Sequence, residues 1–220
     1  MDLTEQFDGY CERVDFTYWS EPVNALTNAA FLIAAFIMWR RLRGHDLPLA
    51  NLLVYILTAI GIGSYLFHTH ATGWAAIADV APIGLFILTY LFAVGRDFLN
   101  WRWWGGVAMM VGFIPFALVV TPLFERSAFF GISDFYWNVP VLLVLFAPLV
   151  ARQNSQTAAG MVLGAAILTL SITLRSYDMP ICEELPLGSH FWWHILNGVM
   201  LGWMIEVYRR HMVGNGARPS

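Results

Sequence analysis

Residues 48–68 read PLANLLVYILTAIGIGSYLFH and contain no Asp, Glu, Lys or Arg. An α-helix needs about 20 such residues to cross the hydrocarbon core of a bilayer, and it satisfies its backbone hydrogen bonds internally. The buried strands of a soluble α/β protein, which are the alternative, would be shorter and separated by turn residues. The stretch therefore predicts a transmembrane helix.

Six other stretches of the chain have the same character. Of the 220 residues, 58% are hydrophobic and only 12% are charged, a low share for a soluble domain. No linker or internal repeat divides the chain, so we expect one all-α membrane domain over residues 1–220. Its seven predicted spans are 22–39, 48–68, 74–94, 104–122, 135–151, 156–174 and 188–208.

All 12 basic residues are arginine, and their positions predict the orientation. Positive residues gather on the cytoplasmic side of membrane proteins. With seven spans and the N-terminus outside, only Arg13, Arg126 and Arg175 fall on the outer side. We therefore expect an outer N-terminal segment over residues 1–21 and a cytoplasmic tail over residues 209–220. The inner arginines are Arg40, Arg41, Arg43, Arg96, Arg102, Arg152, Arg209, Arg210 and Arg218.

The chain has two cysteines, Cys11 and Cys182, and this topology places both on the outer side. That side permits disulfides when it is the periplasm or an organelle lumen. We expect a disulfide between them, the alternative being two unrelated free thiols. An outer N-terminus and a disulfide together favour a bacterial inner membrane, with the site facing the periplasm. No basic patch exists for nucleic acid.

Five polar residues fall at the outer ends of three predicted spans. Ser64 and His68 share one helical face, as do His190 and His194, and Asp79 lies early in the third span. Ionisable groups inside a membrane are costly and indicate function. Three histidines are a typical catalytic zinc set, with water in the open fourth position. Asp79 could then deprotonate that water, and Ser64 could donate to an oxyanion.

Other readings of these residues remain open at this point. The histidines could be ordinary interfacial residues at helix ends. His70 is a rival for His68, although it falls in the short outer turn, whereas His45 and His211 fall on the inner side. Asp79 could instead form a structural ion pair with Arg175.

Four stretches between residues 10 and 198 together carry a likeness to a known family. Their combined Ser-x-x-x-His, Asp and His-x-x-x-His pattern is specific, whereas each piece alone is common. On these motifs the chain resembles the alkaline ceramidases, in the superfamily that includes the adiponectin-type receptors. The stretches are Tyr10-Cys11-Glu12 with Glu21-Pro22-Val23-Asn24 and Asn28; Gly63-Ser64-Tyr65-Leu66-Phe67-His68; Asp79 with Pro82; and His190-Phe191-Trp192-Trp193-His194-Ile195-Leu196, with Asp178 and Cys182 upstream.

The resemblance implies a seven-span zinc amidohydrolase of sphingolipid metabolism. By it, His68, His190 and His194 bind zinc, Asp79 positions the catalytic water and Ser64 stabilises the oxyanion. It also implies the Cys11–Cys182 disulfide. The substrate would be a ceramide-like membrane lipid, whose amide is hydrolysed to a fatty acid and a sphingoid-type amine. The chain is shorter than the eukaryotic enzymes and has no lysine, which points to a bacterial member.

The resemblance also raises a calcium site in the N-terminal segment. The eukaryotic enzymes bind calcium there through an Asp-Trp-x-Glu-x-Asn pattern and a later Glu. Glu12 and Glu21 match, but Gly9 and Val14 replace the Asp and the Asn. Asp8 and Asp15 are adjacent acidic residues that could supply oxygen ligands instead. The alternative is a solvated acidic tail.

Two rival functions remain at this point. The adiponectin-type relatives suggest a receptor or sensor with the same zinc site, but the short inner loops offer little surface for a partner. A metal or lipid transporter would show inverted repeats and polar groups at the bilayer midplane. Neither feature is evident in the sequence.

Overall fold

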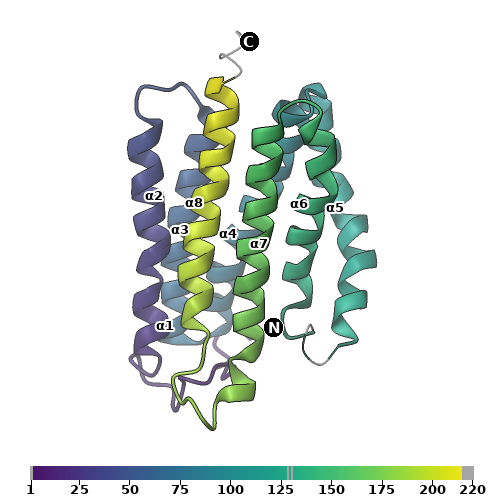
Figure 1. Ribbon diagram of the computed structural model, residues 1–220. Helices are drawn as coiled ribbons and strands as arrows, with labels where there is room; N and C mark the ends of the chain where they lie inside the picture. Colours follow the sequence, from purple (N-terminus) through teal and green to yellow (C-terminus); the bar gives the residue numbers. More distant parts are fainter. Residues whose placement is uncertain (1, 128, 130, 215–220) are drawn as a thin grey trace.

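The computed structural model describes residues 2–127, 129 and 131–214, and these residues form an all-helical bundle (Figure 1). No strand occurs among them; one isolated bridge pairs Gln6 with Thr72. The helices are α1 Pro22–Thr27, α2 Ala29–Leu42, α3 Pro48–His70, α4 Gly73–Ala93, α5 Arg102–Glu125, α6 Asn138–Ala151, α7 Ser155–Tyr177 and α8 Phe191–Gly214, with short segments η1 Val94–Phe98, η2 Gly131–Trp137 and η3 Met179–Ile181.

Six helices in the described residues are long and apolar enough to cross a membrane, and each covers one of the first six predicted spans. The helices α1 and α2 together make the first of them, Pro22–Leu42. The seventh predicted span corresponds to α8, which is 24 residues long and carries Glu206, Arg209 and Arg210 near its end. The helix begins at Phe191, so His190 directly precedes it instead of lying inside it. Of the predicted tail, residues 215–220, including Arg218, lie outside the described residues.

Helix α8 packs between α2 and α7, where glycines let the backbones approach (Figure 1). A Cβ built on Gly198 would lie 2.9 Å from the backbone of Ala30, and one on Gly164 would lie 2.3 Å from the sulfur of Met204. Small residues are the usual means of close helix packing in membranes, because lipid gives apolar side chains no reason to prefer one another. This packing fixes the start of α8 beside the start of α2, and the end of α3 lies at the same end of the bundle.

The helices α3 and α4 are closest at Gly63. A Cβ on this residue would lie 2.0 Å from the carbonyl oxygen of Ala78 and 3.1 Å from the amide nitrogen of Asp79. Both contacts are with backbone, so no side-chain rotation can relieve them. The absence of a side chain at Gly63 therefore brings Ser64 and Asp79 together.

We expect Gly63→Ala to lower the free energy of unfolding by about 3 kcal/mol, because an extra methyl group here forces the two backbones apart. Chemical or thermal unfolding in mild detergent measures the change. Gly84→Ala in α4 is the matched control, since nothing lies within 4 Å of its Cβ position. Alanine is the better helix former, so this control should be neutral or slightly stabilising. Equal stabilities for the two variants would contradict the close contact.

The N-terminal segment closes one end of the bundle, which we call the capped end. The disulfide Cys11–Cys182 joins this segment to the loop before α8, with the two Cα atoms 5.4 Å apart. The backbone amide of Phe7 donates to the carbonyl of Ala71 at the end of α3, at 2.8 Å. The cap thus ties together the ends of α3, α7 and α8, where the polar residues gather.

Candidate metal centre

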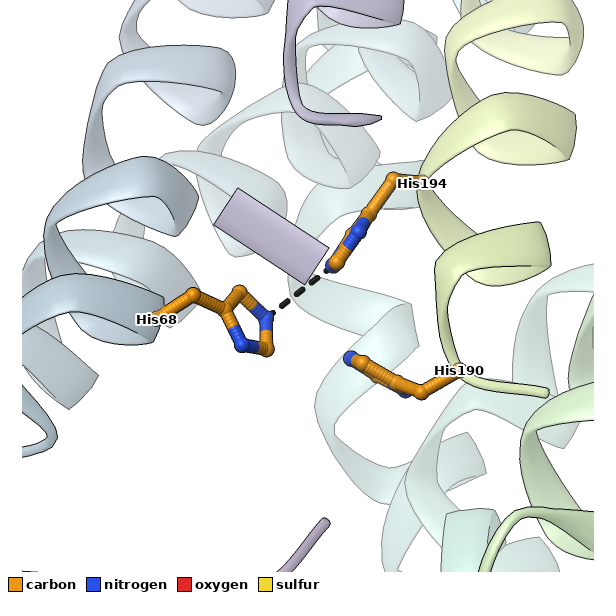
Figure 2. Close-up of side chains that lie close together, drawn as sticks. All are labelled: His68, His190 and His194. Atoms are coloured by element: carbon orange, nitrogen blue, oxygen red, sulfur yellow. Dashed lines mark hydrogen bonds between the residues drawn. The ribbon is translucent and has the colours of Figure 1, made fainter. Parts of the chain in front are cut away.

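Three histidines from two helices meet beneath the cap. His68 lies in the last turn of α3, His190 directly before α8 and His194 in the first turn of α8. The ligand nitrogens of this group all lie within 4.8 Å of one another, and none of the three residues is more than 1% exposed. Figure 2 shows His68 facing the other two rings across a small gap. This geometry could hold a metal ion.

The hydrogen-bond partner of His194 determines which of its nitrogens is free. The Thr27 hydroxyl lies 2.8 Å from the carbonyl oxygen of Val23, which can only accept, so the hydroxyl donates there. The Thr27 oxygen must then accept from Nδ1–H of His194, 2.9 Å away. The proton therefore sits on Nδ1 and leaves the Nε2 lone pair facing the site.

His68 has the same tautomer for a similar reason. Its Nδ1 lies 2.6 Å from the Glu21 carboxylate, to which it donates. The Arg13 guanidinium pairs with the other oxygen of Glu21 and donates to the backbone carbonyl of His68 at 3.0 Å. Burial alone would raise the pKa of Glu21, but the hydrogen bonds of His68 and Asn24 and the charge of Arg13 hold it below its ordinary value. A carboxylate behind a ligating histidine is a common feature of metal sites.

The two lone pairs point to a cation between these rings. Nε2 of His68 and Nε2 of His194 are 3.0 Å apart, and neither carries a proton in the tautomers above. Two bare acceptors at that distance repel each other unless a proton or a metal ion lies between them. Two nitrogens on one tetrahedral zinc, at 2.0–2.1 Å each, would be about 3.3 Å apart. The donor set therefore fits zinc.

His190 completes the group in a different environment. Its ring stacks on Tyr10 with 3.8 Å between centroids, and its buried Nδ1 has no hydrogen-bond partner among the residues that the structure describes. The backbone amide of His190 donates to Asp178 at 2.8 Å, which positions the residue before α8. His70, the rival for His68, is exposed and lies outside the group.

Ser64 and Asp79 lie beside the histidines. Ser64 is one turn before His68 in α3 and is only 3% exposed. Its hydroxyl interacts with the Asp79 carboxylate, which also interacts electrostatically with His68 and Arg175. Asp79 is not a member of the metal-binding group. Three protein ligands with a carboxylate nearby leave a fourth position open for water or substrate.

The structural ion pair between Asp79 and Arg175, which the sequence left open as an alternative, is not formed. No salt bridge joins the two side chains, both of which the structure describes. Arg175 instead donates to the Ser133 hydroxyl at 2.8 Å and to the Tyr10 hydroxyl at 3.3 Å. Asp79 therefore interacts with Arg175 only through longer-range electrostatics and makes no direct ion pair among the described residues.

The carboxylates considered for calcium have other partners. Glu12 accepts from the amides of Val23 and Asn24 at the start of α1, and Glu21 is held by Arg13 and His68. Asp8 and Asp15 are exposed. Across the described part of the chain, these carboxylates do not form a metal-binding group. A calcium ion at Glu21 would have to displace the Arg13 guanidinium.

An apolar cavity lies deeper in the bundle. It is lined by side chains of α2, α3, α4, η2, α6, α7 and α8, including Phe86, Tyr136, Leu143, Trp193 and Met204, and has a volume of about 70 Å³. Trp193 directly precedes His194 of the candidate metal-binding group, so the cavity reaches the level of the site. An acyl chain would fit only if flexible side chains such as Met204 moved aside.

Thr27 and Arg13 are supporting residues that the sequence did not single out. Thr27 lies in an unremarkable helical turn, which gave no signal. Arg13 is a lone arginine in an acidic segment, and its burial, at 5% exposure, is visible only in the folded chain.

Thr27→Val should weaken zinc binding about 10- to 100-fold, because it removes the acceptor that fixes the His194 tautomer while keeping the side-chain shape. Competition against a chromophoric chelator measures the affinity. Thr58→Val is the matched control, since the Thr58 hydroxyl bonds only the carbonyl of Val54 in α3. Unchanged affinity in Thr27→Val would contradict the assigned tautomer.

Most of the chain matches a known protein family. The family model described as "Ceramidase" matches residues 8–215 of the chain. None of the curated proteins compared with the chain matches it.

Proposed function

Because the chain belongs to the ceramidase family, we propose that it is an intramembrane zinc-dependent amidohydrolase acting on a ceramide-like lipid. The products would be a fatty acid and a sphingoid-type amine. The observation that carries the proposal is the group of three buried histidines, two with their Nε2 lone pairs fixed toward a common point, beside Asp79 and Ser64.

When bound, zinc would lower the pKa of a water molecule to near 7 and polarise the substrate carbonyl. Asp79 accepts a proton from the attacking water as its oxygen bonds to the carbonyl carbon. The Ser64 hydroxyl donates a hydrogen bond to the oxygen that becomes negative. Asp79 then returns the proton to the amide nitrogen as the carbon–nitrogen bond breaks, releasing the acid and the amine.

The proposal includes the membrane placement. We take α8 as a seventh span, with the capped end outside the cytoplasm of a bacterium. The Cys11–Cys182 disulfide supports this, because such bonds persist in oxidising compartments. Arginines at the ends of α2, η1, α6 and α8 gather at the opposite end of the bundle, as expected for the cytoplasmic side.

A panel of lipid amides tests the activity. Purified protein in mild detergent is incubated with N-acyl lipids that differ in headgroup and acyl length, and both products are quantified by mass spectrometry. We expect equimolar acid and amine from at least one lipid. No products should form from the matching N-alkyl analogue, which lacks the amide carbonyl. Failure to cleave any amide with one zinc bound per chain would overturn the proposal.

A further inference from the structure

Arg175 is a cation at the capped end of α7 that feels the charge of Asp79 but makes no direct ion pair with a carboxylate in the described part of the chain. Its hydrogen-bond partners are two hydroxyls, those of Ser133 and Tyr10, and its Nε is buried with no partner. Both partners are neutral hydroxyls, so these hydrogen bonds bring no negative charge to the guanidinium.

Three aromatic rings surround this guanidinium. Its central carbon lies 5.0 Å from the ring centroid of Trp193, 5.3 Å from that of Tyr136 and 6.0 Å from that of Tyr10. Ring faces attract a cation only weakly compared with an anion at hydrogen-bond distance. Burying an arginine without a direct ion pair costs free energy of desolvation. In a membrane protein such a residue indicates a function.

The guanidinium borders a second cavity at the capped end, of about 350 Å³. The cavity is also lined by Tyr10, Phe67 and Ile132, and Ile132 is 46% exposed, so the cavity opens outward. Two carboxylates line it. Asp178 accepts hydrogen bonds from the backbone amides of Cys11, Ser189 and His190. Asp8 is exposed, so solvent screens its charge.

This cavity lies one ring away from the metal centre. Tyr10 lines the cavity on one side and stacks on His190 on the other, with 3.8 Å between centroids. Arg175 also contacts Trp193, which lines the apolar cavity. A lipid amide at the histidines could therefore place its acyl chain in the apolar cavity and its amine-side headgroup beside Arg175.

We propose that Arg175 binds an anionic group on the amine part of the substrate, so that the preferred lipids are anionic N-acyl amines instead of neutral ceramides. That the anionic group belongs to the substrate rests on the proposed function, whereas the anion site itself does not. Arginine presents several donors in a planar fork, which matches both phosphate and carboxylate. Either group would serve, and the test separates them.

The first experiment compares three lipids with one acyl chain: a neutral ceramide, its 1-phosphate, and an N-acyl amino acid with a free carboxylate. We expect the wild type to prefer one anionic lipid over the ceramide by about tenfold in kcat/KM, the effect of a charge-assisted hydrogen bond. Whichever anionic lipid is preferred identifies the group. In Arg175→Gln the ratio should fall to about one.

Arg126→Gln is the matched control, because Arg126 is an exposed cation beyond the end of α5 at the same end of the bundle. It should keep the wild-type ratio, which excludes general attraction of anions to this face. The proposal is overturned if the wild type prefers the neutral ceramide, or if Arg175→Gln keeps the preference for an anionic lipid.

A binding measurement keeps the test valid if Arg175→Gln folds poorly or if no amide is cleaved. Thermal unfolding of wild type and Arg175→Lys is followed with dodecyl phosphate, dodecanoate or uncharged dodecanol. At least one anionic amphiphile should raise the Tm of wild type more than dodecanol does. This rise in Tm should be smaller in Arg175→Lys, because lysine lacks the planar set of guanidinium donors. Stabilisation without any amide cleavage would support the anion site while the proposed function fails. Equal shifts for all three amphiphiles would overturn the site.

Discussion

Asp79→Asn is expected to lower lipid-amide turnover about 10²- to 10⁴-fold while the protein keeps its metal. Asparagine has nearly the same shape but cannot accept the proton of the attacking water or return it to the leaving nitrogen. Asp79 interacts with Ser64 and faces His68, but it is not in the metal-binding group. The metal should therefore stay bound when the carboxylate is lost.

Turnover and bound metal should be measured on the same preparation of this variant. Asp134→Asn is the control, because Asp134 lies in η2 at the same end and its carboxylate bonds the adjacent amide of Phe135. The control should retain turnover within about twofold. Wild-type turnover in Asp79→Asn would contradict the proton-transfer role, and loss of metal in that variant would make Asp79 a ligand.

His194→Ala is expected to abolish metal binding and turnover together. The substitution removes one of the three proposed ligands and, with it, the Nδ1–H group that donates to the Thr27 oxygen. Two remaining histidines are too few for a tight zinc site. Elemental analysis of protein purified without a histidine tag gives the metal content, and the lipid assay gives the turnover.

The control for this variant is His70→Ala. His70 lies two residues after a ligand, at the same end of the bundle, but it is exposed and outside the group. It should keep both metal and activity. A metal-loaded His194→Ala protein would show that the ion sits elsewhere.

The sequence predicted the positions of the helices well, because an apolar stretch of about 20 residues with few charges rarely forms anything other than a membrane-spanning helix. Six predicted spans coincide with apolar helices. The start of α8 was placed three residues early, since Asp178 and the cap, which arrange His190 before the helix, come from other parts of the chain. The last span ends in charged residues, where Arg209 and Arg210 each pair with Glu206.

The histidines were predictable as a group because spacing and depth along the helices placed them at one end. The residues that hold or surround the histidines could not be predicted in the same way. Glu21 entered the sequence argument as a calcium ligand, but the folded chain puts it behind His68, with Arg13 as its cation. Arg175 was considered as a partner for Asp79, whereas the structure surrounds it with rings and hydroxyls. Such pairings depend on how helices rotate against each other, which periodicity in one sequence does not determine.

A zinc titration of metal-free protein tests the central claim most directly. The protein is stripped with a chelator, zinc is added in steps below one equivalent, and hydrolysis of the best lipid amide is measured at each step. The account predicts no turnover without zinc, a linear rise, and a plateau at about one zinc per chain. Full turnover in the stripped protein, or no turnover at any zinc level, would contradict it.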